Sequence, residues 1–320
     1  MSTTRSRLRP RALAGSTIGA TVLALALTGC GGSSESASSA VPGGAPSSAP
    51  ATDFLADAPV ADAAAILPGS TMERIKERGE LVVAEALDAP LLSQQDPADP
   101  DQVTGFDADM AKALATYILG EPKVKIVPPA TETREALLAN GTVDVVFNTY
   151  TITPERAEQV DFAGPYFSSG LAIAVKTGTT GISTVADLDG KKVIVGANTP
   201  AVTAVPEQAP NAEIITFGTD PQAVQALTQG RGDAYVQDIT LLASNAVSNK
   251  DITVVGSPFT AEPYGIGLQH DDPQMKQFVN DWLEQIYADG TWAEIWENSL
   301  GTVVQGDAPT PPEIGSVPGS

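Results

Sequence analysis

The segment Thr149-Tyr-Thr-Ile-Thr-Pro-Glu-Arg156 combines hydroxyl groups, a proline and an arginine in an order that could bind an anion. Thr153 is a typical helix N-cap residue and Pro154 a typical first helical residue, which would place Arg156 in the first turn. A cation is unfavourable there for the helix dipole, unless a carboxylate lies opposite and accepts hydrogen bonds from the guanidinium. An exposed arginine in a turn fits the same spacing equally well.

Composition narrows the kinds of chemistry that the chain can perform. Its 320 residues include 18 Lys and Arg against 39 Asp and Glu, and a net charge of -21 repels the phosphates of nucleic acids. With only one cysteine, Cys30, and one histidine, His270, an intramolecular disulfide and a Cys/His zinc site are both excluded. We therefore expect no nucleic-acid partner, no metal and no cofactor. The length suffices for two lobes, each with its own core.

The first 29 residues have the pattern of a bacterial secretion signal. A basic start precedes an apolar run from Ile18 to Leu27 that is too short to span a bilayer. Leu27-Thr-Gly-Cys30 resembles the bacterial lipobox, in which small residues precede a cysteine that is lipidated and becomes the new N-terminus. We expect Cys30 to carry a lipid anchor; the alternative is a secretion signal with an incidental cysteine. The basic residues are Arg5, Arg7, Arg9 and Arg11.

Both ends of the remaining chain have compositions that do not favour a core. Residues 30–70 are rich in Gly, Ser, Ala and Pro at their start, which predicts a disordered tether. Residues 304–320 are rich in Pro and Gly, which predicts a disordered tail. The folded unit is therefore expected to cover residues 71–303.

Inside this unit, short β-type runs alternate with helical patterns, which predicts an α/β fold with largely parallel strands. Part of the pattern occurs twice. Val124-Lys-Ile-Val leads through a helical segment to Asp144, and Glu213-Ile-Ile-Thr leads likewise to Asp233, at a constant offset of 89 residues. This predicts two similar lobes, with chance similarity between two ordinary βαβ units as the alternative.

The offset also relates Thr149 to Asp238, because each residue follows the second strand of its own repeat. In open α/β sheets, ligands bind beyond the carboxyl ends of the strands. We therefore expect Thr149 and Asp238 to face each other across a cleft between the lobes.

Several short motifs occur in an order that resembles the polar amino-acid family of ABC-transporter solute-binding proteins, family 3, and in particular the glutamate-binding lipoproteins of actinobacteria. The resemblance covers residues 71–301. It implies a periplasmic-binding-protein-like fold, in which lobe 1 (about 71–168 and 264–303) and lobe 2 (about 169–263) are joined by a two-crossing hinge. The motifs are Gly105-Phe-Asp, Asn140-Gly-Thr-Val-Asp144, Thr151-Ile-Thr-Pro-Glu-Arg156, Val160-Asp-Phe162, Pro165-Tyr166, Asp187-Leu-Asp-Gly190, Tyr264-Gly-Ile-Gly267 and Ala288-Asp-Gly-Thr291.

The resemblance implies a role for each residue of the candidate site. Arg156 and Thr151 would bind the α-carboxylate of an amino acid. The backbone carbonyl of Thr149 would accept from the α-ammonium, which Asp238 would bind from the other lobe.

Arg134 and Thr131 match positions that bind the side-chain carboxylate in acidic-amino-acid binders of the family. The ligand implied is glutamate or aspartate, with glutamine and asparagine as alternatives. The alternative for Arg134 is a solvated helix position beside Glu132 and Glu135.

The chain also departs from the family pattern. Pro200 lies where relatives commonly offer a backbone N–H to the carboxylate, and proline has none, so Thr199 or Ala201 would have to supply the donor. Some acidic-ligand relatives have a further arginine where this chain has Ala86.

The implied function is transport. A lipid-anchored monomer on the extracytoplasmic face of the membrane would capture its ligand, deliver it to an ABC permease with its ATPase, and catalyse no reaction. The alternatives are an amino-acid sensor lipoprotein and a dehydratase-type enzyme on the same fold.

Overall fold

The computed structural model describes residues 53–303 and 307–320. Cys30, the signal segment 1–29 and the part of the expected tether before residue 53 therefore lie outside the described residues. Within the described part, no helix combines the length and the apolar character needed to cross a bilayer.

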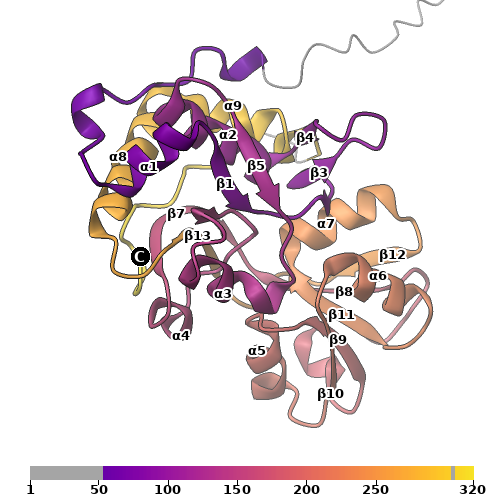
Figure 1. Cartoon of the computed structure of the whole chain (residues 1–320). Coiled ribbons are helices and arrows are strands. Elements are labelled where there is room, and N and C mark those ends of the chain that lie inside the picture. Colours follow the sequence, from indigo (N-terminus) through magenta and orange to yellow (C-terminus); the bar gives the residue numbers. More distant parts are fainter. Residues whose placement is uncertain (1–52, 304–306) are drawn as a thin grey trace, which may run out of the picture. The chain divides into compact units, whose positions relative to one another are not determined.

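The first lobe is built on a five-stranded sheet with the order β5-β1-β6-β13-β7. Strands β1, β5 and β6 are parallel, whereas β13 runs antiparallel to both of its neighbours. Figure 1 shows this sheet beneath helices from the early part of the described chain, in purple, and from its late part, in yellow. The strands are β1 (Leu81–Ala84), β5 (Val124–Val127), β6 (Val145–Val146), β7 (Asp161–Ser169) and β13 (Glu262–Leu268).

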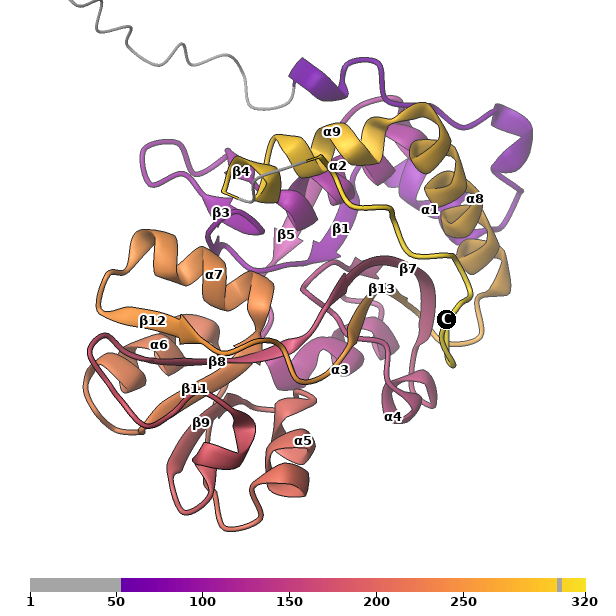
Figure 2. The same cartoon turned by 180° about the vertical axis from the view of Figure 1, so that it is seen from behind.

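The second lobe is built on another five-stranded sheet, with the order β10-β9-β11-β8-β12. The chain passes between the two sheets twice, from β7 into β8 and from β12 into β13, as the view in Figure 2 shows. This arrangement confirms the α/β fold with two lobes and two crossings. The strands are β8 (Leu171–Lys176), β9 (Lys192–Gly196), β10 (Glu213–Phe217), β11 (Ala234–Asp238) and β12 (Ile252–Val255).

The two lobes repeat one local structure. In each lobe, a central strand pairs with a parallel strand on either side. The central strand is β1 in β5-β1-β6 and β9 in β10-β9-β11. Asp144 Oδ2 accepts a hydrogen bond from the backbone N–H of Val82 over 2.7 Å, and Asp233 Oδ2 accepts one from Lys192 over 2.8 Å. Asp144 and Asp233, 89 positions apart, thus make the same contact, so the two segments of the sequence repeat have equivalent local structures.

Helices cover both sheets, and a small sheet of β2 (Asp88–Ala89), β3 (Ser93–Gln95) and β4 (Val103–Thr104) lies beside α2. Short 3-10 turns occur at Asp53–Leu55, Ala63–Ala65, Thr131–Thr133, Val185–Leu188 and Leu300–Thr302. The helices are α1 (Thr71–Arg78), α2 (Phe106–Leu119), α3 (Arg134–Ala139), α4 (Pro154–Ala157), α5 (Ala201–Gln208), α6 (Asp220–Thr228), α7 (Ile239–Ser248), α8 (Pro273–Asp289) and α9 (Thr291–Glu297).

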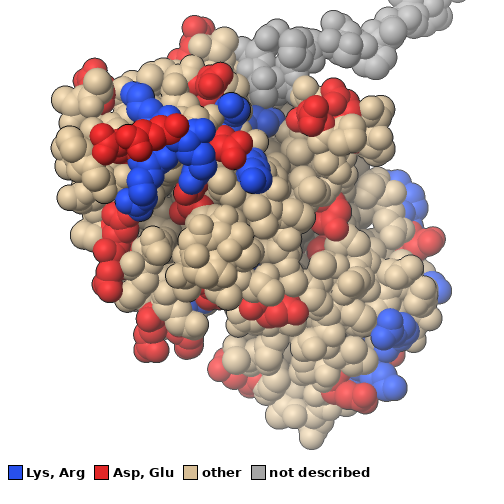
Figure 3. All heavy atoms as spheres, viewed as in Figure 1, with Lys and Arg blue, Asp and Glu red and all other residues tan. Residues whose placement is uncertain are grey.

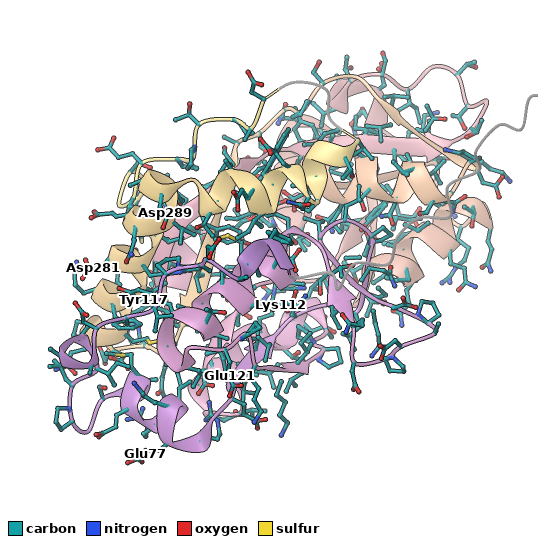
Figure 4. All side chains as sticks on the ribbon, turned by 90° about the horizontal axis from the view of Figure 1, so that it is seen from above. Glu77, Lys112, Tyr117, Glu121, Asp281 and Asp289 are labelled. Carbon is teal, nitrogen blue, oxygen red and sulfur yellow. The ribbon has the colours of Figure 1, made fainter. Side chains whose placement is uncertain are left out.

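Helix α2 is the central helix of the first lobe and is buried along most of its length. It packs against α1, α8 and α9, and the ring of Tyr117 lies 5.0 Å from that of Phe278 on α8. Figure 4 shows Tyr117 of α2 and Asp281 of α8 on these neighbouring helices.

Basic side chains gather on the face shown in Figure 3, over the region of α1 and β5. The sequences there include Arg74, Arg78 and Lys125, but α1 also carries Glu73 and Glu77. Both signs of charge are therefore mixed on this surface, and it is not a uniformly cationic one.

Parts of the expected tether and tail are packed against the first lobe. The side chain of Leu55 is buried in its core, and the backbone N–H of Ala61 donates to the carbonyl of Tyr117 over 2.8 Å. Near the other end, Val317 packs beside the sheet and the N–H of Gly315 donates to the carbonyl of Gly164 over 2.9 Å. The disorder expected for residues 53–70 and 307–320 is thus not what the structure has. A few well-spaced apolar residues are enough to order a segment when they pack against an existing core. The average composition of the segment does not reveal them.

Candidate functional site

A cavity of about 380 Å³ lies between the two lobes, at the carboxyl ends of strands from both sheets. All seven predicted ligand-binding residues line it. They are Thr131, Arg134, Thr149, Thr151 and Arg156 from the first lobe, and Thr199 and Asp238 from the second.

Arg156 is held in the first turn of α4, where Thr153 is the N-cap and accepts from the backbone N–H of Arg156 over 3.3 Å. Its guanidinium is buried and donates through Nη1 to the carbonyl of Thr151 and through Nη2 to that of Asn198, each over 2.7 Å. Glu135 Oε1 lies 3.5 Å from Nε and offsets the unfavourable helix position. The alternative interpretation, in which Arg156 is an exposed arginine in a turn, is therefore wrong.

Arg134 is also buried, with 2% of its surface exposed, so a solvated helix position is wrong as well. Its Nε donates to the carbonyl of Thr131 over 3.0 Å, and Nη1 donates to that of Asn148 over 3.1 Å. Among the described residues, Nη2 has no hydrogen-bond partner. Burial first, and then repulsion by Arg156, lower the pKa of Arg134 to about 10, so it remains a cation at neutral pH.

Tyr150 connects the two arginines and was missed by the sequence reasoning, as was Glu135. The guanidinium carbons of Arg134 and Arg156 lie 4.5 and 4.7 Å from the centre of its ring, which is a cation–π distance. Its hydroxyl donates to Glu135 Oε1 over 2.7 Å. The position of Tyr150 between the two motif threonines was the available signal; nothing in the sequence related Glu135 to Arg156.

Asp238 provides a carboxylate from the second lobe at the end of β11. It is 4% exposed, and its Oδ1 has no hydrogen-bond partner in the part of the chain that is described. Burial, followed by repulsion from Glu262, raises the pKa of Asp238 to about 7. An unpaired buried carboxyl group beside a cavity can be stabilised by a cationic ligand group.

Asp107 also lines the cavity. It was given no role from the sequence, although it is part of the Gly105-Phe-Asp motif. Its Oδ1 accepts from the hydroxyl of the buried Tyr166 over 2.7 Å. Burial raises the pKa of Asp107 to about 6. It lies in the first turn of α2, where a carboxylate also suits the helix dipole.

The hydroxyls of Thr199 and Thr131 already have acceptors. Thr199 Oγ1 donates to the carbonyl of Gly196 over 2.8 Å, and Thr131 Oγ1 donates across the cleft to that of Ala197 over 2.6 Å. Pro200 lines the cavity next to Thr199, whereas Ala201 is not among the lining residues. Of the two candidate donors that could replace the N–H missing at Pro200, Thr199 is therefore the one at the cavity.

The cavity is mixed in charge, because Asp88 and Asp220 line it together with the two arginines. Both oxygens of Asp220 accept hydrogen bonds, from the hydroxyl of Tyr235 and the side-chain amide of Asn245, each over 2.7 Å. Within the described ranges, no group of three or more His, Cys, Asp or Glu residues is arranged to hold a metal ion. The arrangement suits a ligand with both negative and positive groups.

Comparisons with known proteins agree on one family. Residues 81–302 match the bacterial extracellular solute-binding proteins, family 3. The chain is 34% identical over 229 residues to the ABC transporter glutamine-binding protein GlnH of Bacillus subtilis, covering 71% of this chain and 83% of that protein. It is 33% identical over 238 residues to the glutamate-binding protein GluB of Corynebacterium glutamicum, covering 70% of this chain and 80% of that protein.

Solved structures show the same fold. An ancestral arginine-binding protein bound to glutamine is similar with a TM-score of 0.65 and 35% identity, over 70% of this chain and 99% of that one. The ancestral amino acid-binding protein AncCDT-1, a precursor of cyclohexadienyl dehydratase, is similar with a TM-score of 0.65 and 38% identity. The match covers 72% of this chain and 99% of that one.

Proposed function

The chain belongs to family 3 of the bacterial extracellular solute-binding proteins, and we propose that it captures glutamate or aspartate for an ABC importer. Its family, and relatives that it matches over most of their length, make the chain an amino-acid-binding protein of an ABC transport system. The acidic ligand, the role of each residue and the lipid anchor are the parts we propose.

One observation carries the proposal: two buried arginines from the first lobe line a cavity that Asp238 lines from the second lobe, and within the described residues the Oδ1 atom of Asp238 has no hydrogen-bond partner. An α-amino acid has a carboxylate and an ammonium on one carbon, so it can engage Arg156 and Asp238 together. Thr151 and Thr199 supply further polar atoms at the same cavity. The carbonyl of Thr149 would accept from the ammonium.

The acidic side chain is assigned through Arg134. Its Nη2 is buried and has no partner among residues 53–303 and 307–320, and a ligand carboxylate would give that nitrogen an acceptor and the buried cation a counter-ion. Glutamine is the main competitor, because a relative at 34% identity is a glutamine-binding protein and an amide oxygen can also accept from Arg134.

An enzyme is the second candidate. AncCDT-1 is described as the precursor of a dehydratase. Two of the carboxyl groups that line the cavity, those of Asp107 and Asp238, have pKa values of about 6 and 7, which would suit acid–base catalysis. Incubation of the protein with its ligand and mass analysis of the mixture would separate the two. A binding protein returns the ligand unchanged.

We further propose that Cys30 is lipidated and holds the domain at the extracytoplasmic face of the membrane as a monomer. The lipobox-like sequence before Cys30 supports this. Cys30→Ser should release the protein from the membrane fraction, and retention after detergent-free washing would contradict the anchor.

The binding proposal is tested by calorimetric titration of the protein with each of the twenty amino acids. We expect glutamate or aspartate to bind most tightly and Arg156→Ala to weaken binding at least about 30-fold, because one hydrogen-bonded charge pair contributes about 2 kcal/mol or more. Arg231→Ala is the matched control, since Arg231 is exposed, lies over the ring of Phe217 and does not line the cavity. A dissociation constant within threefold of the original for Arg156→Ala would refute its role as carboxylate anchor.

A further inference from the structure

Asn198 of the second lobe makes two hydrogen bonds to charged side chains of the first lobe. Its carbonyl accepts from Arg156 Nη2 over 2.7 Å, and its side-chain Nδ2 donates to Glu135 Oε2 over 3.2 Å. One residue thus offers an acceptor to the cation and a donor to the anion of the same ion pair.

The backbone of Asn198 is placed for this double contact. Its φ of 54° lies in the left-handed region, which asparagine adopts more readily than most residues other than glycine. The residue lies in the turn between β9 and α5, next to Thr199 at the cavity.

The partners of Asn198 form a unit that belongs entirely to the first lobe. Glu135 Oε1 accepts from the hydroxyl of Tyr150 and lies 3.5 Å from Arg156 Nε, while Arg156 also donates to the carbonyl of Thr151. This unit does not depend on the second lobe for its connections. The contact with Asn198 is therefore made when the lobes approach and lost when they separate.

We propose that Asn198 is a positioning residue that couples closure of the two lobes to the orientation of the Arg156 guanidinium. This inference rests on the proposed function. In the closed arrangement Asn198 fixes Nη2 of Arg156, and Glu135 fixes Nε, so that the remaining guanidinium hydrogens are held for the ligand. In an open arrangement Arg156 loses one acceptor and Glu135 loses one donor, so the carboxylate site is complete only after closure.

The first test separates the side chain of Asn198 from its backbone. Asn198→Gly tolerates the left-handed conformation and keeps the carbonyl that Arg156 contacts, but removes the donor to Glu135. We expect about a 3- to 10-fold higher dissociation constant, mainly from faster ligand dissociation in stopped-flow measurements. Asn211→Gly is the matched control, because Asn211 is exposed on the same lobe and bonds only to Asp189 there.

The second test uses rescue. Asn198→Asp sets a carboxylate against Glu135 and should raise the dissociation constant about 30-fold, because like charges across an interface disfavour closure. In the double variant Asn198→Asp with Glu135→Gln, the new amide can donate to the new carboxylate. We expect its affinity to return to within about threefold of Glu135→Gln alone, a coupling that independent structural damage would not produce.

A third measurement does not need a ligand. Small-angle X-ray scattering of the ligand-free protein should give a larger radius of gyration for Asn198→Asp than for the original protein, since the open arrangement becomes more populated. If the protein binds no amino acid at all, the proposed function fails while this measurement still tests the contact. Unchanged scattering for Asn198→Asp, or additive losses in the double variant, would overturn the proposal.

Discussion

Asp107 accepts a hydrogen bond from the backbone N–H of Thr149, with 2.9 Å between Oδ2 and the nitrogen. Thr149 has a φ of 44°, in the left-handed region that threonine rarely adopts. The carboxylate of Asp107, itself fixed by the hydroxyl of Tyr166, thereby holds the turn that follows β6 in a strained conformation. That turn supplies three residues of the cavity wall, namely Asn148, Thr149 and Thr151.

We expect Asp107→Ala to lower the free energy of unfolding by about 2 to 4 kcal/mol, because the buried hydroxyl of Tyr166 and the half-buried N–H of Thr149 lose their acceptor. Ligand affinity should fall with it, since the turn can relax. Asp107→Asn is the matched variant: its amide oxygen can still accept from Thr149, and the hydroxyl of Tyr166 can rotate to accept from the new NH2 group. Chemical denaturation and calorimetry of both variants check this, and equal losses would mean that the hydrogen bond to Thr149 is not what matters.

Much of this site could be predicted from the sequence because it follows from backbone periodicity. The 89-residue offset related Thr149 to Asp238, and the rule for strand ends placed both at one cavity. The N-cap and proline signals located Arg156 in the first turn of α4. Such features depend on residues close together in the chain.

Contacts between distant segments could not be predicted in this way. Glu135 meets Arg156, and Asn198 reaches Glu135 from the other lobe, only because the chain folds both segments toward Tyr150. The packed ends were missed for a related reason. Composition reports the average of a segment, whereas burial of Leu55 or Val317 depends on the surface that the residue meets.

The C-terminal residues should contribute to stability. Val317 packs against the core cluster that contains Ile152, as Ala157 of α4 does, whereas Val303 is 41% exposed. Val317→Asp should lower the free energy of unfolding by about 1 to 3 kcal/mol, because it loses apolar burial and gains a charge to desolvate. Val303→Asp, the matched control, should change it by less than about 0.5 kcal/mol. Equal denaturation midpoints for the two variants would show that residues 307–320 do not stabilise the lobe.

Asp238 should make ligand binding depend on pH. Its pKa of about 7 without ligand means that protonation competes with the ligand ammonium, so affinity should fall about tenfold from pH 8 to pH 6. The same pKa is raised above the usual value of the unfolded chain. Without ligand, the contribution of Asp238 to the free energy of unfolding therefore increases as the pH falls through 7, whereas the affinity for the ligand decreases.

Calorimetry in buffers of different ionisation enthalpy provides the check on Asp238. At pH 7 about half a proton should be released per ligand bound, since about half of the ligand-free molecules carry a proton on Asp238. Asp238→Asn should bind weakly and release none. Proton release that persists in Asp238→Asn would assign the titration to another group, with Asp107 as the first to examine.

Arg134 should decide between acidic ligands and their amides. Arg134→Met keeps an unbranched side chain of similar length but removes the cation, so a ligand carboxylate would be buried without a counter-ion. Glutamate or aspartate should then weaken far more than glutamine or asparagine, and the preference should shift by about 30-fold or more, because one fully used charge pair contributes about 2 to 4 kcal/mol. Arg134→Lys keeps the charge but loses the planar guanidinium that donates to Thr131 and Asn148. Its preference for acids over amides should lie between those of the original protein and Arg134→Met. Titration of each variant with the four ligands measures this preference. A loss equal for acids and amides would show that Arg134 shapes the wall beneath Tyr150 without reading the ligand side chain, and the ligand would then be described only as a polar amino acid.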